Sequence, residues 1–144
     1  KYADFSPLPE GNKIAGFITR LKRRQIEFYA AATVGATEVI RGLGSFLTPM
    51  PTYLAYNAGD FAAGYLINWS ALYTMETFPG LKRISEKSRV NIGSGVALGL
   101  IAAVELSPIF GTPDLLDIPA GVLGILASYG VRRLAQRWVG EKIN

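Results

Sequence analysis

Residues 81–106, LKRISEKSRVNIGSGVALGLIAAVEL, contain in one stretch the pattern that decides the fold. The first nine residues hold four basic side chains, and the seventeen that follow hold none. A soluble domain disperses its charge over its surface, whereas apolar segments that alternate with basic ones are typical of a polytopic membrane protein. Residues 90–106 are therefore predicted to form a membrane span.

The same alternation recurs along the rest of the 144 residues, which have room for one domain. Apolar segments at 28–47, 53–75 and 117–132 approach the ~20 residues that a helix needs to cross a ~30 Å hydrocarbon layer. Hydrophobic residues make up 49% of the chain and charged residues 18%, which agrees with this pattern. The sequence predicts an all-α integral membrane protein, a bundle of four transmembrane helices, with its membrane domain at 28–137.

Residues 1–27 form the segment before the first span, with an irregular arm over 1–12. Ile14, Phe17, Ile18 and Leu21 then recur at helical spacing beside a run of basic residues. This pattern suits an amphipathic helix that lies on a membrane surface. A solvated basic run that flanks the first span explains the same residues equally well, and both interpretations stay open.

Basic residues also predict the orientation. They gather before the first span, between the second and third spans, and after the fourth, whereas the connections 48–52 and 107–116 contain no Lys or Arg. Because basic loops stay in the cytoplasm, the N-terminus, the middle loop and the tail at 138–144 are expected there. We expect a multi-pass protein of the bacterial cytoplasmic (inner) membrane.

Cysteine and histidine are both absent, which excludes disulfides, Cys or His metal sites, thiol nucleophiles and His general bases. No metal-ligand motif is present, so we predict no metal and no cofactor. Metal-assisted hydrolysis by Asp114 and Asp117 has no motif to support it, and we expect a protein that is not an enzyme. The net charge of +4 follows from membrane topology, so nucleic acid is not an expected partner.

Charged residues inside or beside apolar spans are rare and usually functional. At 1.5 Å per residue, most of those in this chain fall in the outer leaflet, and Arg41 has possible partners in Glu38 on its own helix and Asp60 on the next. The alternatives are a bound head group, helix packing by ion pairs, and helix capping. The candidate polar cluster comprises Glu38, Arg41, Asp60, Glu105, Asp114 and Asp117.

Each predicted span also carries a stripe of small or polar residues at helical spacing. Asp60, Gly64 and Asn68 share one face of the second span, and small residues share one face of the fourth. The corresponding residues of the third span are Asn91, Ser94 and Glu105. We expect these faces to meet in the interior of the bundle.

The fragment TPDLLDIPAGVLG at 112–124 resembles the Asp-x-x-Asp and Ala-Asn-x-x-Gly motifs of the VanZ-like family of small bacterial membrane proteins. Glu105 falls where that family carries a Glu, and Asp60 and Tyr65 match part of its Asp-Lys-x-x-His-Phe motif. The sequence departs from the family at Phe61, Gly64, Pro108 and Gly121, in place of Lys, His, Gln and Asn. The resemblance covers about 53–130. It implies a link to tolerance of lipoglycopeptide antibiotics, for which the family has no established chemistry.

The predicted function is therefore a non-enzymatic, VanZ-like membrane protein whose outer-leaflet polar cluster binds the head group of a lipid or amphiphile. Membrane lipids are its expected partners. The alternative is a structural or accessory subunit, whose small-residue and apolar faces pack into a larger membrane protein assembly.

Overall fold

The computed structural model describes residues 10–44, 52–107 and 117–141, with the side chains of 10–12, 52–56 and 82 left aside. These residues form four α-helices and one 3₁₀ turn: α1 (Glu10–Gly44), α2 (Thr52–Thr77), η1 (Leu81–Arg83), α3 (Glu86–Glu105) and α4 (Asp117–Trp138). The prediction of an all-α fold with four main helices is confirmed. Measured by length and hydropathy together, none of the helices in these ranges reaches what a membrane crossing requires.

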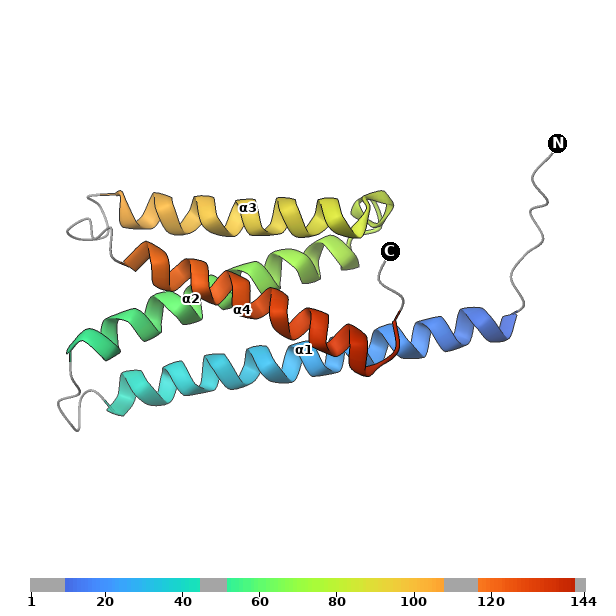
Figure 1. Cartoon of the computed structure of the whole chain (residues 1–144), viewed down its shortest axis with the longest axis horizontal. Coiled ribbons are helices and arrows are strands. Elements are labelled where there is room, and N and C mark those ends of the chain that lie inside the picture. Colours follow the sequence, from blue (N-terminus) through green and yellow to red (C-terminus); the bar gives the residue numbers. More distant parts are fainter. Residues whose placement is uncertain (1–9, 45–51, 108–116, 142–144) are drawn as a thin grey trace.

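Helices α2 and α4 form the centre of the molecule, although α3 separates them in the sequence (Figure 1). Helix α3 packs along one side of this pair and α1 along the other. Both outer helices contact α2 and α4, and within the described residues they do not contact each other. The pair of α2 and α4 is therefore the part of the fold that both outer helices share.

Glycine allows α2 and α4 to approach so closely. A Cβ atom added at Gly64 would overlap the backbone of Gly121, and one added at Gly124 would overlap the backbone of Phe61. The two backbones are thus in direct contact where they cross. The expected inward faces are confirmed for α2 and α4, since Gly64, Asn68, Ala120, Gly124 and Ser128 are all buried.

Helix α3 follows this expectation only in part. Gly93 and Ala97 are buried and Gly93 packs against Leu72, but Asn91 is exposed. The prediction was wrong for Asn91 because α3 has neighbours on one side only, so its inward face is narrower than the stripe of small and polar residues in the sequence.

Helix α1 is a single helix of 35 residues, about 52 Å long at 1.5 Å per residue. It joins the basic amphipathic segment to the first predicted span without a break. Its N-terminal part projects past the other helices (Figure 1), and Ile14, Phe17, Ile18 and Leu21 are exposed there.

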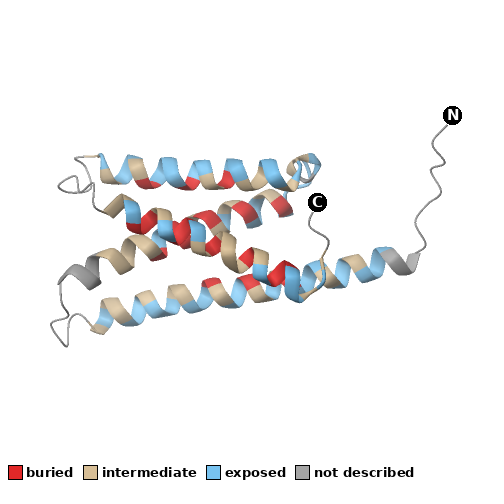
Figure 2. Cartoon of the chain, viewed as in Figure 1, coloured by how far each residue is buried: buried red, intermediate tan, exposed pale blue. Residues whose placement is uncertain are grey.

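Buried residues lie where the helices face one another, and much of α1 and α3 is exposed (Figure 2). The cluster of buried apolar side chains is small, consisting of Ala97, Ile101 and Ile125 with Ile67 packed against it. Asn68 and Gln136 are the largest side chains that are completely buried, at 0% exposure. Leu98, Leu100, Leu123 and Leu126, in contrast, are exposed.

Candidate functional site

Three carboxylates from three helices meet at one end of the bundle, and we call them the carboxylate cluster: Asp60 of α2, Glu105 of α3 and Asp117 of α4. One oxygen of each lies within 4.8 Å of an oxygen of the others, and all three residues are partly exposed. Asp117 is in the first turn of α4, where the helix dipole favours an acid. The three negative charges repel one another, so a cation in their midst would be stabilised.

Glu38 and Arg41 of α1 form an ion pair beside α2. Nε of Arg41 lies 3.0 Å from each carboxylate oxygen of Glu38, and both side chains are partly buried. The pair rests against Gly59, where an added Cβ would lie 3.3 Å from Nη2 of Arg41. Glycine at this position leaves room for the guanidinium next to Asp60.

The candidate residues predicted from the sequence are thus found in two groups on the same part of the fold. Asp60, Glu105 and Asp117 come together, and Glu38 and Arg41 pair with each other on the adjoining helix. Asp114 lies outside the described residues. Hard cations such as Ca²⁺ prefer oxygen ligands, and the carboxylate cluster offers one oxygen from each of its three members.

A second polar cluster lies near the opposite end of α2, and the sequence did not single it out. Its centre is Glu27 and Arg23 of α1, Glu76 of α2 and Arg132 of α4, all four buried. Glu86, Gln136 and Glu141 surround them. We call these seven residues the arginine–glutamate network.

Glu76 is the centre of this network. Nη2 of Arg23 lies 3.0 and 2.9 Å from its two oxygens, and Arg132 donates a further hydrogen bond. Burial alone would raise the pKa of Glu76, but the charges of Arg132 and Arg23 and the hydrogen bond from Arg132 outweigh it and lower that pKa below its usual value.

Glu27 shares the same two arginines with a different result. Its ion pairs with Arg23 and Arg132 are both 3.7 Å long, and its buried Oε1 has no hydrogen-bond partner among the described residues. Burial is therefore the largest effect and raises the pKa of Glu27, with Arg132 and Arg23 opposing it only in part. Two neighbouring buried acids thus shift in opposite directions because one is hydrogen-bonded by arginine and the other is not.

A third set of polar contacts lies between the two clusters. Nδ2 of Asn68 donates to Oγ of Ser128 at 2.6 Å and to the carbonyl of Ile125 at 3.3 Å, and Oγ of Ser94 donates to Oδ1 of Asn68 at 3.2 Å. Asn68 therefore joins α2, α3 and α4 at a fully buried position. A buried amide with its partners supplied specifies the register of the three helices.

Sequence reasoning missed the arginine–glutamate network because Arg23 and Arg132 counted only as markers of orientation. The available clue was the spacing of Arg23 and Glu27, four apart, which places them on one helix face. Glu76 and Arg132 each stand at an end of a predicted span, where either residue suits solvent. Only the packing of α2 against α4 shows that they face each other.

Comparison with known proteins adds no assignment. No family model, no curated protein and no solved structure matches this chain. The function therefore rests on the chemistry of the described residues.

Proposed function

We propose that this chain is a non-enzymatic, polytopic membrane protein that binds the cationic head group of a lipid or amphiphile at the carboxylate cluster. The exposure of many large apolar side chains, together with the burial of four charged ones, supports a membrane location. In water, exposing many large apolar side chains while burying four charged ones costs free energy twice, once for each set. In hydrocarbon the same arrangement is favourable, because polar groups must find partners inside the protein.

Because charged residues pair inside the bundle, its outer surface is more apolar than the number of charged residues in the sequence suggests. The charges of Arg23, Glu27, Glu76 and Arg132 compensate one another in the interior, and Glu38 compensates Arg41. Trp138 is 84% exposed at the end of α4, beside the basic residues Arg133 and Arg137. An amphipathic ring in this position suits the interface between membrane and water.

The carboxylate cluster supports the binding part of the proposal. One acid at a helix N-terminus is explained by capping, and this accounts for Asp117 alone. Asp60 lies within α2 and Glu105 ends α3, so neither serves as a cap for α4. A cationic head group, or a divalent ion that bridges to a phosphate, would compensate the excess of negative charge.

The VanZ-like assignment is part of this proposal. Asp60, Glu105 and Asp117, three positions that carry the resemblance, come from three helices to one place. Their convergence is what a shared functional site of such a family requires. The corresponding location is the bacterial cytoplasmic membrane.

Topology labelling tests the membrane part. Single cysteines replacing Lys22, Lys82 and Thr112 are labelled in sealed cells with an impermeant thiol reagent, and the absence of native cysteine removes background. We expect labelling at position 112 only, and labelling at all three after permeabilisation. Labelling at 82 but not at 112 in sealed cells would overturn the proposed topology.

Mild purification tests the head-group site. The Asp60→Asn, Glu105→Gln double variant is compared with wild type and with Glu10→Gln, a control that removes one negative charge at the far end of α1. We expect the double variant to lose a bound lipid or divalent ion that the other two retain, with unchanged helical circular dichroism. Equal lipid and ion content in all three preparations would refute the site.

The surface of α1 favours one alternative, an accessory subunit of a larger membrane assembly. Val39, Ile40 and Leu43 are exposed near its end, in addition to the apolar residues on the projecting part. A partner helix would cover these residues. In the same purification, one protein present in stoichiometric amount, with the lipid content unaffected by the double variant, would favour the subunit.

A further inference from the structure

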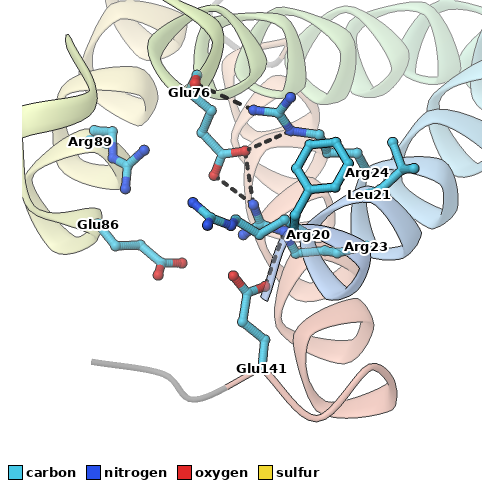
Figure 3. Close-up of a pocket in the computed structure, with 9 residues that line it drawn as sticks. Arg20, Leu21, Arg23, Arg24, Glu76, Glu86, Arg89 and Glu141 are labelled. Atoms are coloured by element: carbon cyan, nitrogen blue, oxygen red, sulfur yellow. Dashed lines mark hydrogen bonds and ion pairs between the residues drawn. The ribbon is translucent and has the colours of Figure 1, made fainter. Parts of the chain in front are cut away.

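A cavity of about 350 Å³ opens beside the arginine–glutamate network, between α1 and the start of α3 (Figure 3). Arg20, Arg23 and Arg24 line it from α1, and Arg89 lines it from α3. Four guanidinium groups around one cavity repel one another unless negative charge lies among them. Which acids supply that charge decides what else the cavity can bind.

The acids that line the cavity are already engaged with cations or donors of the network. Arg23, Arg24 and Arg132 bind Glu76. Nε of Arg23 lies 3.2 Å from Oε2 of Glu141. Glu86 accepts a hydrogen bond from Gln136 and has Arg132 at 3.5 Å. Their negative charge is therefore directed largely toward Arg23, Arg24 and Arg132.

Arg89, and in part Arg24, keep donors that make no hydrogen bond. The Nε atoms of Arg24 and Arg89 are buried and have no hydrogen-bond partner among the described residues. Figure 3 shows Arg89 reaching from α3 with no interaction drawn to the other labelled residues. Arg24 also pairs with Glu76, since its Nε lies 3.6 Å from Oε2 of Glu76 and its Nη2 donates to the carbonyl of Glu76 at 3.3 Å, and its guanidinium stacks 5.6 Å from the ring centre of Tyr73. A positioned guanidinium with free N–H groups is the usual recognition element for a tetrahedral oxyanion.

We propose that this cavity binds a phosphate group, with Arg20 and Arg89 as its recognition residues. Five arginines and four glutamates belong to the cavity and the network together: Arg20, Arg23, Arg24, Arg89 and Arg132 against Glu27, Glu76, Glu86 and Glu141. This leaves an excess of positive charge on the side of the cavity. Phosphate oxygens would accept hydrogen bonds from the N–H groups that do not bind the glutamates.

The walls of the cavity fit an amphiphile in particular. Phe17 and Leu21 line it next to the arginines and are 63% and 48% exposed. An acyl chain would cover both apolar side chains while its phosphate contacts the guanidinium groups. The shared chemistry is a phosphate monoester or diester, carried by a lipid head group or by a soluble molecule.

The test is a pair of titrations of the full chain in a neutral detergent, followed by calorimetry. One probe is inorganic phosphate, and the other is a short-chain phosphatidic acid, with the matching uncharged diacylglycerol as its blank. Arg89→Gln is the diagnostic variant because no ion pair of the described network involves Arg89, so its replacement leaves that network intact. Arg83→Gln is the control, with the same loss of charge at an exposed arginine of η1 outside the cavity.

We expect saturable binding of phosphatidic acid that Arg89→Gln weakens about 10-fold, the usual cost of one charge-assisted hydrogen bond, while Arg83→Gln changes it less than about 2-fold. Tighter binding of the lipid than of inorganic phosphate identifies a lipid head group as the source, and equal affinities identify a soluble phosphate. The proposal fails if neither probe binds, or if Arg83→Gln weakens binding as much as Arg89→Gln. Neither result depends on what the carboxylate cluster binds.

Discussion

Arg23 of α1 donates from Nη2 to both carboxylate oxygens of Glu76 on α2, at 3.0 and 2.9 Å, across 53 positions of sequence. Both side chains are buried, so folding moves two charges into the interior of the protein. Burying an ion pair is costly, and removing one partner of a buried pair destabilises the protein by about 3–5 kcal/mol. The bond between Arg23 and Glu76 therefore ties α1 to the rest of the bundle.

Substitution of Glu76 is expected to alter the response to acid. Because the pKa of Glu76 is lowered in the folded state, its contribution to stability is present above its usual value of 4.5 and is lost as the pH falls through the lowered value. Glu76→Gln should destabilise the protein at neutral pH by about 3 kcal/mol. It should also reduce the further loss of stability when the pH is lowered. Thermal unfolding in detergent from about pH 7 to about pH 3 measures both effects.

Glu27→Gln is the matched comparison. The pKa of Glu27 is raised, so its contribution to stability is present below 4.5 and is lost as the pH rises through the raised value. A neutral amide should therefore be tolerated at neutral pH, and destabilise much less than Glu76→Gln. Equal destabilisation by the two substitutions would contradict the different hydrogen bonding of the two acids.

The crossing of α2 and α4 is expected to reject any side chain at Gly64 or Gly124. Gly64→Ala and Gly124→Ala would each force the two backbones apart, and overpacking of this kind costs about 1–3 kcal/mol or more. The controls are Gly95→Ala and Gly99→Ala on α3, where an added Cβ meets nothing within 4 Å. These two should gain up to about 1 kcal/mol, because alanine favours the helix. Unfolding midpoints of the four variants decide the matter.

Asn68 and Ser128 are expected to be coupled. Asn68→Ala removes the donor to Ser128 and leaves the carbonyl of Ile125 without it, at a cost of about 1–3 kcal/mol. In a double-mutant cycle with Ser128→Ala, the two losses should be less than additive, since they share one hydrogen bond. Strict additivity would show that the bond at 2.6 Å contributes nothing.

The pair of Glu38 and Arg41 reports on its surroundings. In water a partly exposed pair contributes at most about 1 kcal/mol, whereas an unpaired charge within a bilayer costs about 2.5 kcal/mol or more. Arg41→Leu should therefore destabilise the bundle, and the Glu38→Arg, Arg41→Glu exchange should restore part of the loss. Unchanged thermal stability of Arg41→Leu in detergent would mean that the pair does not stabilise α1.

Much of the fold could be predicted from the sequence because local patterns determine it. Prolines and charged segments bound the helices, and α3, at Glu86–Glu105, ends within one residue of the predicted span at 90–106. The buried faces of α2 and α4 follow from small residues at helical spacing. Helix α1 differs from the prediction in extent, since no helix-breaking residue separates its basic segment from the apolar one.

The sequence predicts the members of a cluster only where the topology brings their helix ends to the same end of the bundle. Asp60, Glu105 and Asp117 stand near helix ends that the alternating topology brings together. Arg132 and Glu76 could not be assigned to each other in this way, because charged residues at the ends of apolar segments suit solvent as well as a partner. Their pairing depends on the rotation of α4 about its axis, which Gly124 fixes through its contact with Phe61.

The pairing of α2 with α4 also orders the events of synthesis. Ser128, the partner of Asn68, is synthesised 60 residues after it, and Arg132, a partner of Glu76, is synthesised 56 residues after it. At about 5–20 residues per second this delay is on the order of 3–12 s. During that time α2 and α3 have been synthesised, but the amide of Asn68 and the carboxylate of Glu76 lack their partners on α4. A nascent chain that stops before Asp117 should therefore be a substrate for quality-control proteases.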